Sequence, residues 1–449
     1  MKTIHVDFNT KKGDIKPLHG VNNGPKSYGF QMDNSAYFKE AGIPYARLHD
    51  TEYPLGSGYF VDVPAIFKNF DKDAKDPASY DFRLTDEYLK SIKACGTDII
   101  YRLGVTIENE AGTAGIVSPT YINPPEDFEK WSQICAGIIR HYNEGWADGF
   151  HMNIQYWEIW NEPESEAMWT GTREEFYELY TTAACYLKRE FPDVKIGGFG
   201  SIGFYPYTRI DQPCFCDEPY ISLLDYIQDF LTHIRKKNAP LDFFSWHVYS
   251  DDPKEYAIHA KAARKILDMY GFTETESLLD EWNFQSTRGK ARTNCCSALI
   301  AAVLSVLQDN AVDIANYYVA QPRQKTWCGI FDGEKPLKGF FALKAFNLLY
   351  QMGTQVAVEA ETGLYGCAAR KDHIGGIMLT NYQNGLERVA VEVSGFCKED
   401  GIEVQIYAVD ANHDFELVRT ERLTGQEYTL YINPAEDAVL YIELRKMEE

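Results

Sequence analysis

Short apolar, β-prone runs alternate with amphipathic helical patterns along the first three quarters of the chain. The runs predict strands at 18–22, 45–49, 98–104, 155–160, 195–200, 242–249, 277–282 and 313–320. The helical patterns between them lie at 85–95, 125–142, 173–191, 219–237, 253–270, 293–309 and 339–352. Repeated strand–helix alternation is typical of parallel βα units. Eight such units predict a (β/α)8 TIM barrel over residues 14–352.

The period of the pattern changes after residue 352. Short alternating runs follow at 355–361, 364–369, 373–381, 389–393, 402–409, 415–421, 428–432 and 438–444. Turn residues such as Asn384-Gly385 separate them, which is typical of an antiparallel β-sandwich. Residues 3–8 alternate in the same way, so we expect residues 1–13 to add a strand to a sandwich over 353–449.

Two predicted barrel strands end in a carboxylate. The fourth ends in Trp160-Asn161-Glu162-Pro163 and the seventh in Asp280-Glu281-Trp282-Asn283. A residue before proline avoids helical geometry, so we expect Glu162 to be extended at the strand tip. Catalytic groups of TIM barrels lie at the C-terminal ends of strands. Glu162 and Glu281 would then face one another across the barrel mouth, as cleavage of a glycosidic bond requires.

Such chemistry needs two unequal carboxyl groups. The acid must hold a proton near neutral pH, which apolar surroundings or a nearby negative charge promote, whereas the nucleophile must stay ionised. Trp157, Trp160 and Trp169 are close to Glu162 in sequence and would supply an apolar wall. Carboxyl groups about 5–5.5 Å apart imply retention of configuration and about 6.5–9.5 Å implies inversion, a distance the sequence does not give.

Polar residues at other strand ends complete the predicted site. Asn161 suits a sugar hydroxyl, because its amide both donates and accepts. His247 and Tyr249 are two apart on the sixth strand, so they share a face and would donate to the nucleophile or the sugar. Arg47 and His49 share a face of the second strand.

A barrel arginine must be paired, and two pairings of Arg47 remain open. It would either orient the nucleophilic Glu281 or neutralise Glu158, which has the same parity as Glu162. Further candidates to bind substrate are Asn22 and Asp50, which follow the first two strands, and Trp327, which would form a stacking floor.

Composition excludes several classes of partner. The net charge of −22 disfavours a nucleic acid as partner. No apolar window reaches the length of a membrane span, and the start has no apolar signal core, so we expect no membrane and a cytoplasmic location. The chain has no H-E-x-x-H, G-x-S-x-G, Walker or dinucleotide-binding motif, so no metal or cofactor is expected. A homo-oligomer remains open.

Five segments together resemble clan A glycoside hydrolases, and most closely glycoside hydrolase family 39, the β-xylosidase and α-L-iduronidase family. The segments are His19-Gly20-Val21-Asn22-Asn23-Gly24-Pro25, Arg47-Leu48-His49-Asp50, Trp157-Glu158-Ile159-Trp160-Asn161-Glu162-Pro163, His247-Val248-Tyr249 and Asp280-Glu281-Trp282-Asn283. The resemblance implies a retaining enzyme with Glu162 as acid/base and Glu281 as nucleophile. It also implies a β-sandwich beside the barrel.

Two positions depart from the xylosidase pattern. Asp280 precedes the nucleophile where threonine is usual, and the eighth strand lacks a tryptophan, leaving Trp327 as its substitute. A uronidase would need a cation for the substrate carboxylate, for which Arg102, Arg323 and Lys325 are candidates, although surface positions are expected for all three.

The function expected from these observations is hydrolysis of glycosides by a retaining, exo-acting enzyme. The substrate would be a plant-type oligosaccharide, with β-xylosidase placed first and α-L-arabinofuranosidase or uronidase as alternatives. Long loops after the second, third, fifth and eighth strands favour a deep pocket and hence the exo mode. The non-enzyme alternative is an inactive carbohydrate-binding barrel.

Overall fold

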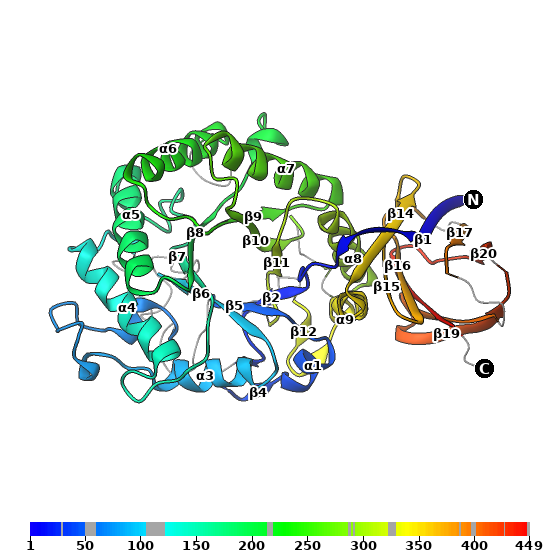
Figure 1. The fold of residues 1–449 in the computed structure, drawn as a ribbon, viewed down its shortest axis with the longest axis horizontal. Helices are drawn as coiled ribbons and strands as arrows, with labels where there is room; N and C mark the ends of the chain where they lie inside the picture. The colour runs from blue at the N-terminus through cyan, green and yellow to red at the C-terminus, as the bar shows by residue number, and fades with distance from the viewer. Residues whose placement is uncertain are drawn as a thin grey trace.

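The computed structural model describes residues 1–27, 30–49, 60–104, 122–212, 219–285, 289–290, 292–321, 329–385, 388–396, 401–425 and 427–446. Eight parallel strands close into a barrel (Figure 1). They are β2 (Gly20–Asn22), β5 (Tyr45–Arg47), β6 (Asp98–Leu103), β7 (Tyr156–Ile159), β8 (Lys195–Ser201), β9 (Phe243–Tyr249), β10 (Glu276–Asn283) and β11 (Ile314–Tyr317). The predicted fold class, a TIM barrel with a β domain, is confirmed.

Helices surround the barrel strands (Figure 1). They are α1 (Ser35–Glu40), α2 (Val63–Ile66), α3 (Arg83–Lys93), α4 (Phe128–Glu144), α5 (Arg173–Glu190), α6 (Ile221–Lys237), α7 (Pro253–Met269), α8 (Asn294–Gln308) and α9 (Lys338–Met352). Local signals fix several of their ends: Asp127 and Asp252 cap α4 and α7, and Gly145, at φ 75°, ends α4. The short α1 and α2 were not predicted, because a helix of so few residues has little periodicity.

The barrel interior changes from apolar to polar along its axis. Five side chains form an apolar layer: Ile100, Tyr156, Phe243, Leu278 and Ile314. Two positions further along the same strands stand buried polar residues, namely Arg102, Glu158, Ser245, Asp280 and Asn316. Residues two apart in a strand share a face, so this polar layer lies directly above the apolar one. It forms the base of the site described below.

Nine further strands form one sheet in the order β19-β18-β21-β16-β15-β14-β1-β17-β20, and the short β3 (Lys26–Ser27), β4 (Met32–Asp33), β12 (Phe331–Asp332) and β13 (Lys335–Pro336) form two separate pairs. The nine strands of the sheet are β1 (Lys2–Asp14), β14 (Thr354–Ala360), β15 (Leu364–Lys371), β16 (Ile374–Asn381), β17 (Val389–Ser394), β18 (Ile402–Val409), β19 (Asp414–Leu423), β20 (Glu427–Ile432) and β21 (Ala438–Lys446). Every neighbouring pair is antiparallel except β1 and β17. The N-terminal strand β1 therefore lies in the interior of this sheet, paired with β14 and β17.

The sheet curls over on itself around its own core. Arg419 of β19 donates to the carbonyl oxygen of Tyr431 in β20 at 2.8 Å, although these strands are opposite edges of the sheet. Inward residues of distant strands, such as Val391 and Val404, belong to one apolar cluster. A single folded sheet thus provides the two layers expected of a sandwich.

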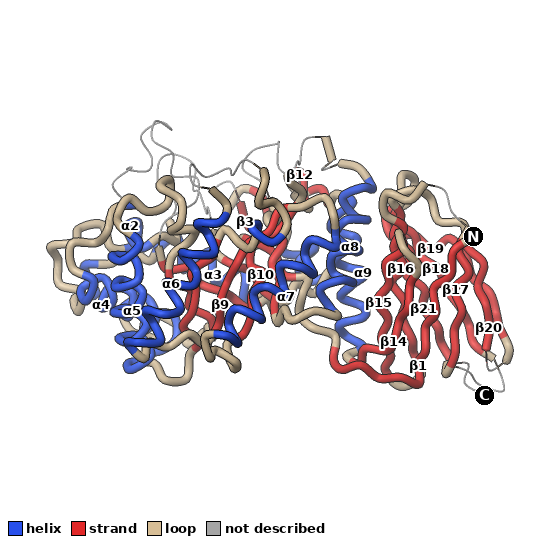
Figure 2. The backbone as a smooth tube through the Cα atoms, turned by 90° about the horizontal axis from the view of Figure 1, so that it is seen from above, coloured by secondary structure: helices blue, strands red, loops and turns tan. Residues whose placement is uncertain are grey.

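The curled sheet packs against α8 and α9 (Figure 2). Met378 and Tyr441 of the sheet share an apolar cluster with Phe346 and Leu349 of α9. Barrel and β domain are therefore joined by a continuous core.

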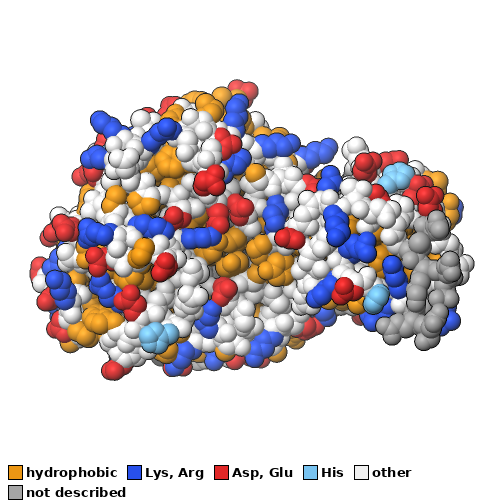
Figure 3. All heavy atoms as spheres, viewed as in Figure 1, with side chains coloured by type: hydrophobic (Ala, Val, Ile, Leu, Met, Phe, Trp, Pro, Cys, Tyr) orange, Lys and Arg blue, Asp and Glu red, His pale blue; other side chains and the backbone are white. Residues whose placement is uncertain are grey.

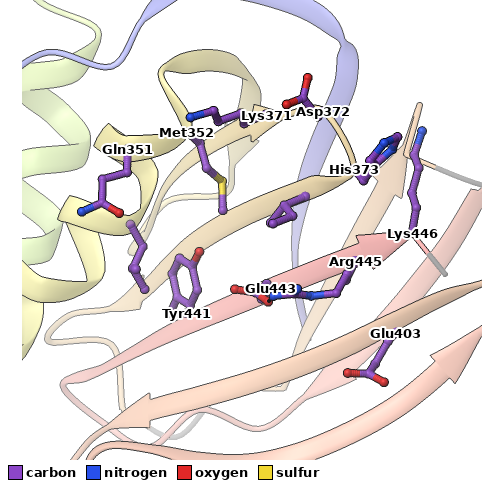
Figure 4. A pocket seen from close by; sticks show the side chains of 12 residues that line it. Gln351, Met352, Lys371, Asp372, His373, Glu403, Tyr441, Glu443, Arg445 and Lys446 are labelled. Atoms are coloured by element: carbon purple, nitrogen blue, oxygen red, sulfur yellow. Dashed lines mark hydrogen bonds and ion pairs between the residues drawn. The ribbon is translucent and has the colours of Figure 1, made fainter. Parts of the chain in front are cut away.

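A cavity of about 820 Å³ opens where α9 meets the sheet (Figure 4). Its lining mixes both charges, as in Lys371, Asp372, Glu403 and Arg445. Acidic and basic side chains are likewise interspersed over the face seen in Figure 3. No helix among the described residues is long and apolar enough to cross a membrane.

Candidate active site

Two buried carboxylates converge at one end of the barrel. Glu162 follows β7, Glu281 lies in β10, and the two residues are 8% and 0% exposed. One carboxylate oxygen of each and one ring nitrogen of His247 all lie within 4.8 Å of one another. The sequence separation of these residues is large, so the barrel brings together what the chain keeps apart.

The backbone at Glu162 differs from the extended geometry predicted before a proline. Its φ is 47°, and that of Trp160 is 71°. The Glu162 N–H donates to the carbonyl of Gly200 at 3.0 Å, and the Trp160 N–H donates to Leu103 at 2.8 Å. Bonds to the two neighbouring strands thus override the local preference. Strained backbone of this kind is held in place by its surroundings and is concentrated at functional sites.

Three side chains surround the Glu281 carboxylate. The Tyr249 hydroxyl donates to Oε2 at 2.7 Å, Arg47 donates to Oε1 at 2.7 Å, and His49 Nε2 lies 3.2 Å from Oε1. Burial by itself would raise the pKa of Glu281. The positive charge of His247, the neighbouring His49 and Arg47, and the Tyr249 hydrogen bond outweigh it and hold that pKa below its usual range. Glu281 is therefore suited to remain ionised.

The pKa of Glu162 is shifted in the opposite direction, above its usual range. Burial raises its pKa, and the charge of Glu281 adds to the rise, against the opposing effect of His247, whose Nδ1 lies 2.7 Å from Oε1. Trp160 and Trp169 pack edge to face nearby in sequence, with ring centroids 5.1 Å apart. Trp157 instead points to the outer face of β7 and stacks on Tyr101, so it forms no part of the expected apolar wall.

Arg47 contacts both of the carboxylates between which the sequence left its pairing open. Its Nε donates to Glu158 and one terminal nitrogen donates to Glu281, each at 2.7 Å. The other terminal nitrogen donates to the Asn161 side-chain oxygen at 2.7 Å. Asn161 Nδ2 is buried and has no hydrogen-bond partner among the described residues, so this amide keeps a donor for a ligand.

The family model of glycosyl hydrolases family 39 matches residues 18–276, more than half of the chain. The chain belongs to this family. The match includes Glu162, His247 and Tyr249 and ends before Glu281.

Two curated relatives of this family 39 protein are β-xylosidases. The one from Caldicellulosiruptor saccharolyticus is 30% identical over 132 residues, 29% of this chain and 23% of the relative. The one from Geobacillus stearothermophilus is 24% identical over 231 residues, 50% of this chain and 40% of the relative. The matched region thus spans less than half of each relative's length.

Solved structures share the fold over the whole chain. A glucosidase from Croceicoccus marinus superposes with a TM-score of 0.82 at 23% identity, covering 100% of both chains. A monomeric β-xylosidase from Caulobacter crescentus gives 0.71 at 15% identity, again covering 100% of both. A GH39 enzyme from Xanthomonas axonopodis pv. citri gives 0.71 at 14%, covering 99% of this chain and 97% of that one.

Asn22 is hydrogen-bonded within this family 39 protein. Its amide nitrogen donates to the carbonyls of Asp280 and Asn316 at 2.8 and 3.3 Å, and its oxygen accepts from Arg47 at 3.3 Å. These bonds tie the start of the barrel to β10 and β11 and favour a positioning role for Asn22 over the predicted contact with substrate. Asp50, Trp327, Arg323 and Lys325 lie outside the described residues, as do large parts of the four long loops.

The surface position expected for Arg102 is wrong, because the side chain is fully buried. Its partner in the β6–β7 register is Glu158, so it faces the barrel interior. One guanidinium nitrogen lies 2.5 Å from Asp62, whereas Nε and the other terminal nitrogen have no hydrogen-bond partner among the described residues. Arg102 is two residues from Ile100 in the same strand, and residues two apart share a face, so the inward side of Ile100 would have predicted the inward position of Arg102.

Two further buried carboxyl groups have pKa values raised to near neutral pH. Burial raises the pKa of Glu158 to about 7, and its Oε1 accepts from the Ser245 hydroxyl at 2.6 Å. Burial likewise raises the pKa of Glu164 to about 7, with Ser201 donating to it at 2.6 Å. Among the described residues, Glu162, His247 and Glu281 are the set whose ligand atoms converge enough for a cation. His247 Nδ1 and Glu162 Oε1 are already hydrogen-bonded to one another, and both Glu281 oxygens accept hydrogen bonds from Arg47 and Tyr249, which favours a carboxylate pair that acts without a metal.

Proposed function

We propose that the protein is a retaining glycoside hydrolase acting by double displacement, with Glu281 as nucleophile and Glu162 as acid/base. One observation carries the proposal: carboxylate oxygens of the two residues lie within 4.8 Å, and their pKa values are shifted in opposite directions. A separation near 5 Å is typical of retaining enzymes, because an inverting enzyme needs room for a water molecule. An inactive sugar-binding barrel would have no use for two opposed carboxyls.

In the first step Glu281 attacks the anomeric carbon while Glu162 gives its proton to the departing glycosidic oxygen. A bond forms between that carbon and a Glu281 oxygen as the glycosidic bond breaks. Tyr249 and Arg47 hold the nucleophile by hydrogen bonds of 2.7 Å each, which fixes the direction of attack. Asn161 Nδ2, which has no hydrogen-bond partner among the described residues, could donate to a sugar hydroxyl beside the reacting carbon.

In the second step the charge states of the two residues are reversed: Glu281 is a neutral ester and Glu162 is an anion. Esterification removes the negative charge of Glu281, which had helped to raise the pKa of Glu162. The Glu162 pKa then falls, and its carboxylate removes a proton from a water that attacks the anomeric carbon. The ester bond breaks, Glu281 regains its charge, and the product keeps the configuration of the substrate.

We place β-xylosides first among substrates, since both curated relatives are β-xylosidases. The similar glucosidase fold adds glucosides to the candidates. Uronides remain because Arg102 has two buried N–H groups without a partner among the described residues. α-L-Arabinofuranosides and an exo mode of attack stay predictions from the sequence.

Aryl glycosides test this function directly. We expect turnover of the aryl β-xyloside and its near loss in Glu281→Ala, by about 10⁴-fold or more. Azide should restore turnover in that variant with inverted product, because the small anion occupies the space of the missing carboxylate. Full activity of Glu281→Ala would exclude it as nucleophile. Absence of turnover by the unaltered protein on the xyloside, glucoside, arabinofuranoside and uronide together would overturn the proposal.

A further inference from the structure

The nucleophile strand turns two consecutive acidic side chains into the barrel. Alternation from the inward Leu278 places Asp280 inside, and Glu281 would then point outward. The β9–β10 register shifts between Leu279 and Glu281, so that Glu281 pairs with the inward His247. Both carboxylates are consequently buried, Asp280 at 1% and Glu281 at 0% exposure. Bulges of this kind redirect side chains beside active sites.

Asp280 lies beside the two cations that hold the proposed catalytic carboxyls. Its Oδ2 is 2.9 Å from Arg47 Nε, and its Oδ1 is 3.4 Å from His247 Nε2. The other side of each cation contacts a carboxyl of the reaction: Arg47 contacts Glu281 and the His247 Nδ1 contacts Glu162, each at 2.7 Å. Each cation therefore bridges Asp280 to one of the reacting groups.

His247 lies between two carboxyl groups, with Nδ1 2.7 Å from Glu162 and Nε2 3.4 Å from Asp280, a position that favours its cationic form. Burial raises the pKa values of Glu158 and Glu162, which favours the neutral form of each. Arg47 and His247 together overcome burial and lower the pKa of Asp280, so Asp280 and Glu281 are the two anions. Arg47 neutralises one of them, and buried charge must be paired. A protonated His247 neutralises the other.

The same balance survives the reaction. In the glycosyl-enzyme Glu281 is a neutral ester and Glu162 has become an anion, so two anions again face two cations. His247 is already hydrogen-bonded to Glu162 and can stay protonated throughout, because Asp280 does not change its charge.

We propose that Asp280 is a positioning residue that keeps His247 doubly protonated and fixes Arg47, so that each cation holds its catalytic carboxyl through both steps. This rests on the proposed roles of Glu162 and Glu281. The groups that face His247 from the surrounding elements are Glu162, Glu164, Asp280, Glu281, Arg47 and His49.

Nitrogen NMR of protein labelled with ¹⁵N-histidine reads the charge of His247 directly, with the signal assigned from a His247→Gln variant. We expect an imidazolium in the unaltered protein across about pH 5 to 8, where an ordinary histidine loses its proton. In Asp280→Asn, which keeps shape but removes charge, His247 should titrate within that range. Glu158→Gln is the matched control, because Glu158 contacts Arg47 and should leave His247 protonated.

Kinetics supply the second readout. Asp280→Asn should lower kcat about tenfold or more with a much smaller change in KM, as expected when transition-state contacts are lost. A His247 that titrates normally in the unaltered protein would overturn the proposal, even where Asp280→Asn does not fold. Unchanged kcat, or a His247 that stays protonated in Asp280→Asn, would also overturn it. The NMR measurement needs no substrate, so its result is independent of whether the proposed hydrolysis is found.

Discussion

At the residue scale, the neighbours of two carboxyl groups of the same type shift their pKa values in opposite directions. Glu281 accepts hydrogen bonds from Tyr249 and Arg47, whereas Glu162 is hydrogen-bonded to His247. Donors stabilise a carboxylate, and burial without enough of them stabilises the neutral acid. The difference in environment, rather than in residue type, is the basis for the proposed roles of Glu281 as nucleophile and Glu162 as acid/base.

Replacement of the acid should depend on the leaving group. Glu162→Ala should lower kcat/KM about 10²-fold or more for a substrate with a poor leaving group, because that oxygen needs a proton. An aryl glycoside whose leaving group departs as a stable anion should lose much less. Steady-state kinetics on both substrates measure the contrast, and equal losses would contradict the acid role.

The pH profile of kcat/KM should be bell-shaped and wide. The acidic limb reports Glu281, whose pKa is lowered, so activity should fall only when the pH drops below the usual range of a glutamate. The alkaline limb reports Glu162, whose pKa is raised, so it should lie above that range. Tyr249→Phe removes a donor to Glu281 and should move the acidic limb upward without moving the alkaline limb. A shift of the alkaline limb alone would contradict the assignment.

At the scale of elements, the loop that carries Glu162 is held between β7 and the start of α5. Thr172 and Glu175 form a reciprocal capping box: the Thr172 hydroxyl accepts from the Glu175 N–H at 3.2 Å, and the Glu175 carboxylate accepts from the Thr172 N–H at 2.8 Å. This box stabilises the helix without contacting Glu162 or Glu281.

Thr172→Ala should lower the free energy of unfolding by about 1 kcal/mol, since it removes the side-chain cap. Urea denaturation measures this change, and kcat should stay within about twofold because the reacting groups are untouched. Thr172→Ser keeps the hydroxyl and serves as the matched control. Equal stability of the alanine and serine variants would show that the cap contributes nothing.

At the scale of the whole molecule, the barrel and the β domain share an apolar cluster that runs from α9 into β16 and β21. The first strand of the chain also pairs with strands more than three hundred residues away, which ties the N-terminus into the C-terminal sheet. If the barrel and the β domain were separated, the apolar surface that each buries against the other would be exposed to water. This arrangement favours cooperative unfolding.

Calorimetry should therefore show one unfolding transition with equal calorimetric and van't Hoff enthalpies. Met378→Ala, at a fully buried position of the shared cluster, should destabilise the whole molecule by about 2–5 kcal/mol. The single transition should move to lower temperature as a unit. Two separate transitions, with only one of them moved, would contradict this coupling.

The sequence by itself determined the order of elements and the main chemical groups. Strand and helix periods are local properties, so the barrel strands and the eight C-terminal strands could be located to within a few residues. Glu162, Glu281, His247 and Tyr249 were found because strand ends and a two-residue spacing are also local. Arg102 was misplaced, although its parity with Ile100 was available.

Only the tertiary structure decided how these groups are used. The positive φ of Glu162 depends on a hydrogen bond to Gly200, and the partners of Arg47 come from three other segments of the chain. The inward turn of both Asp280 and Glu281 depends on the register with β9. Such contacts join residues distant in sequence, and their charges are set by burial and by each other. No local pattern records them, because they exist only once the barrel has closed.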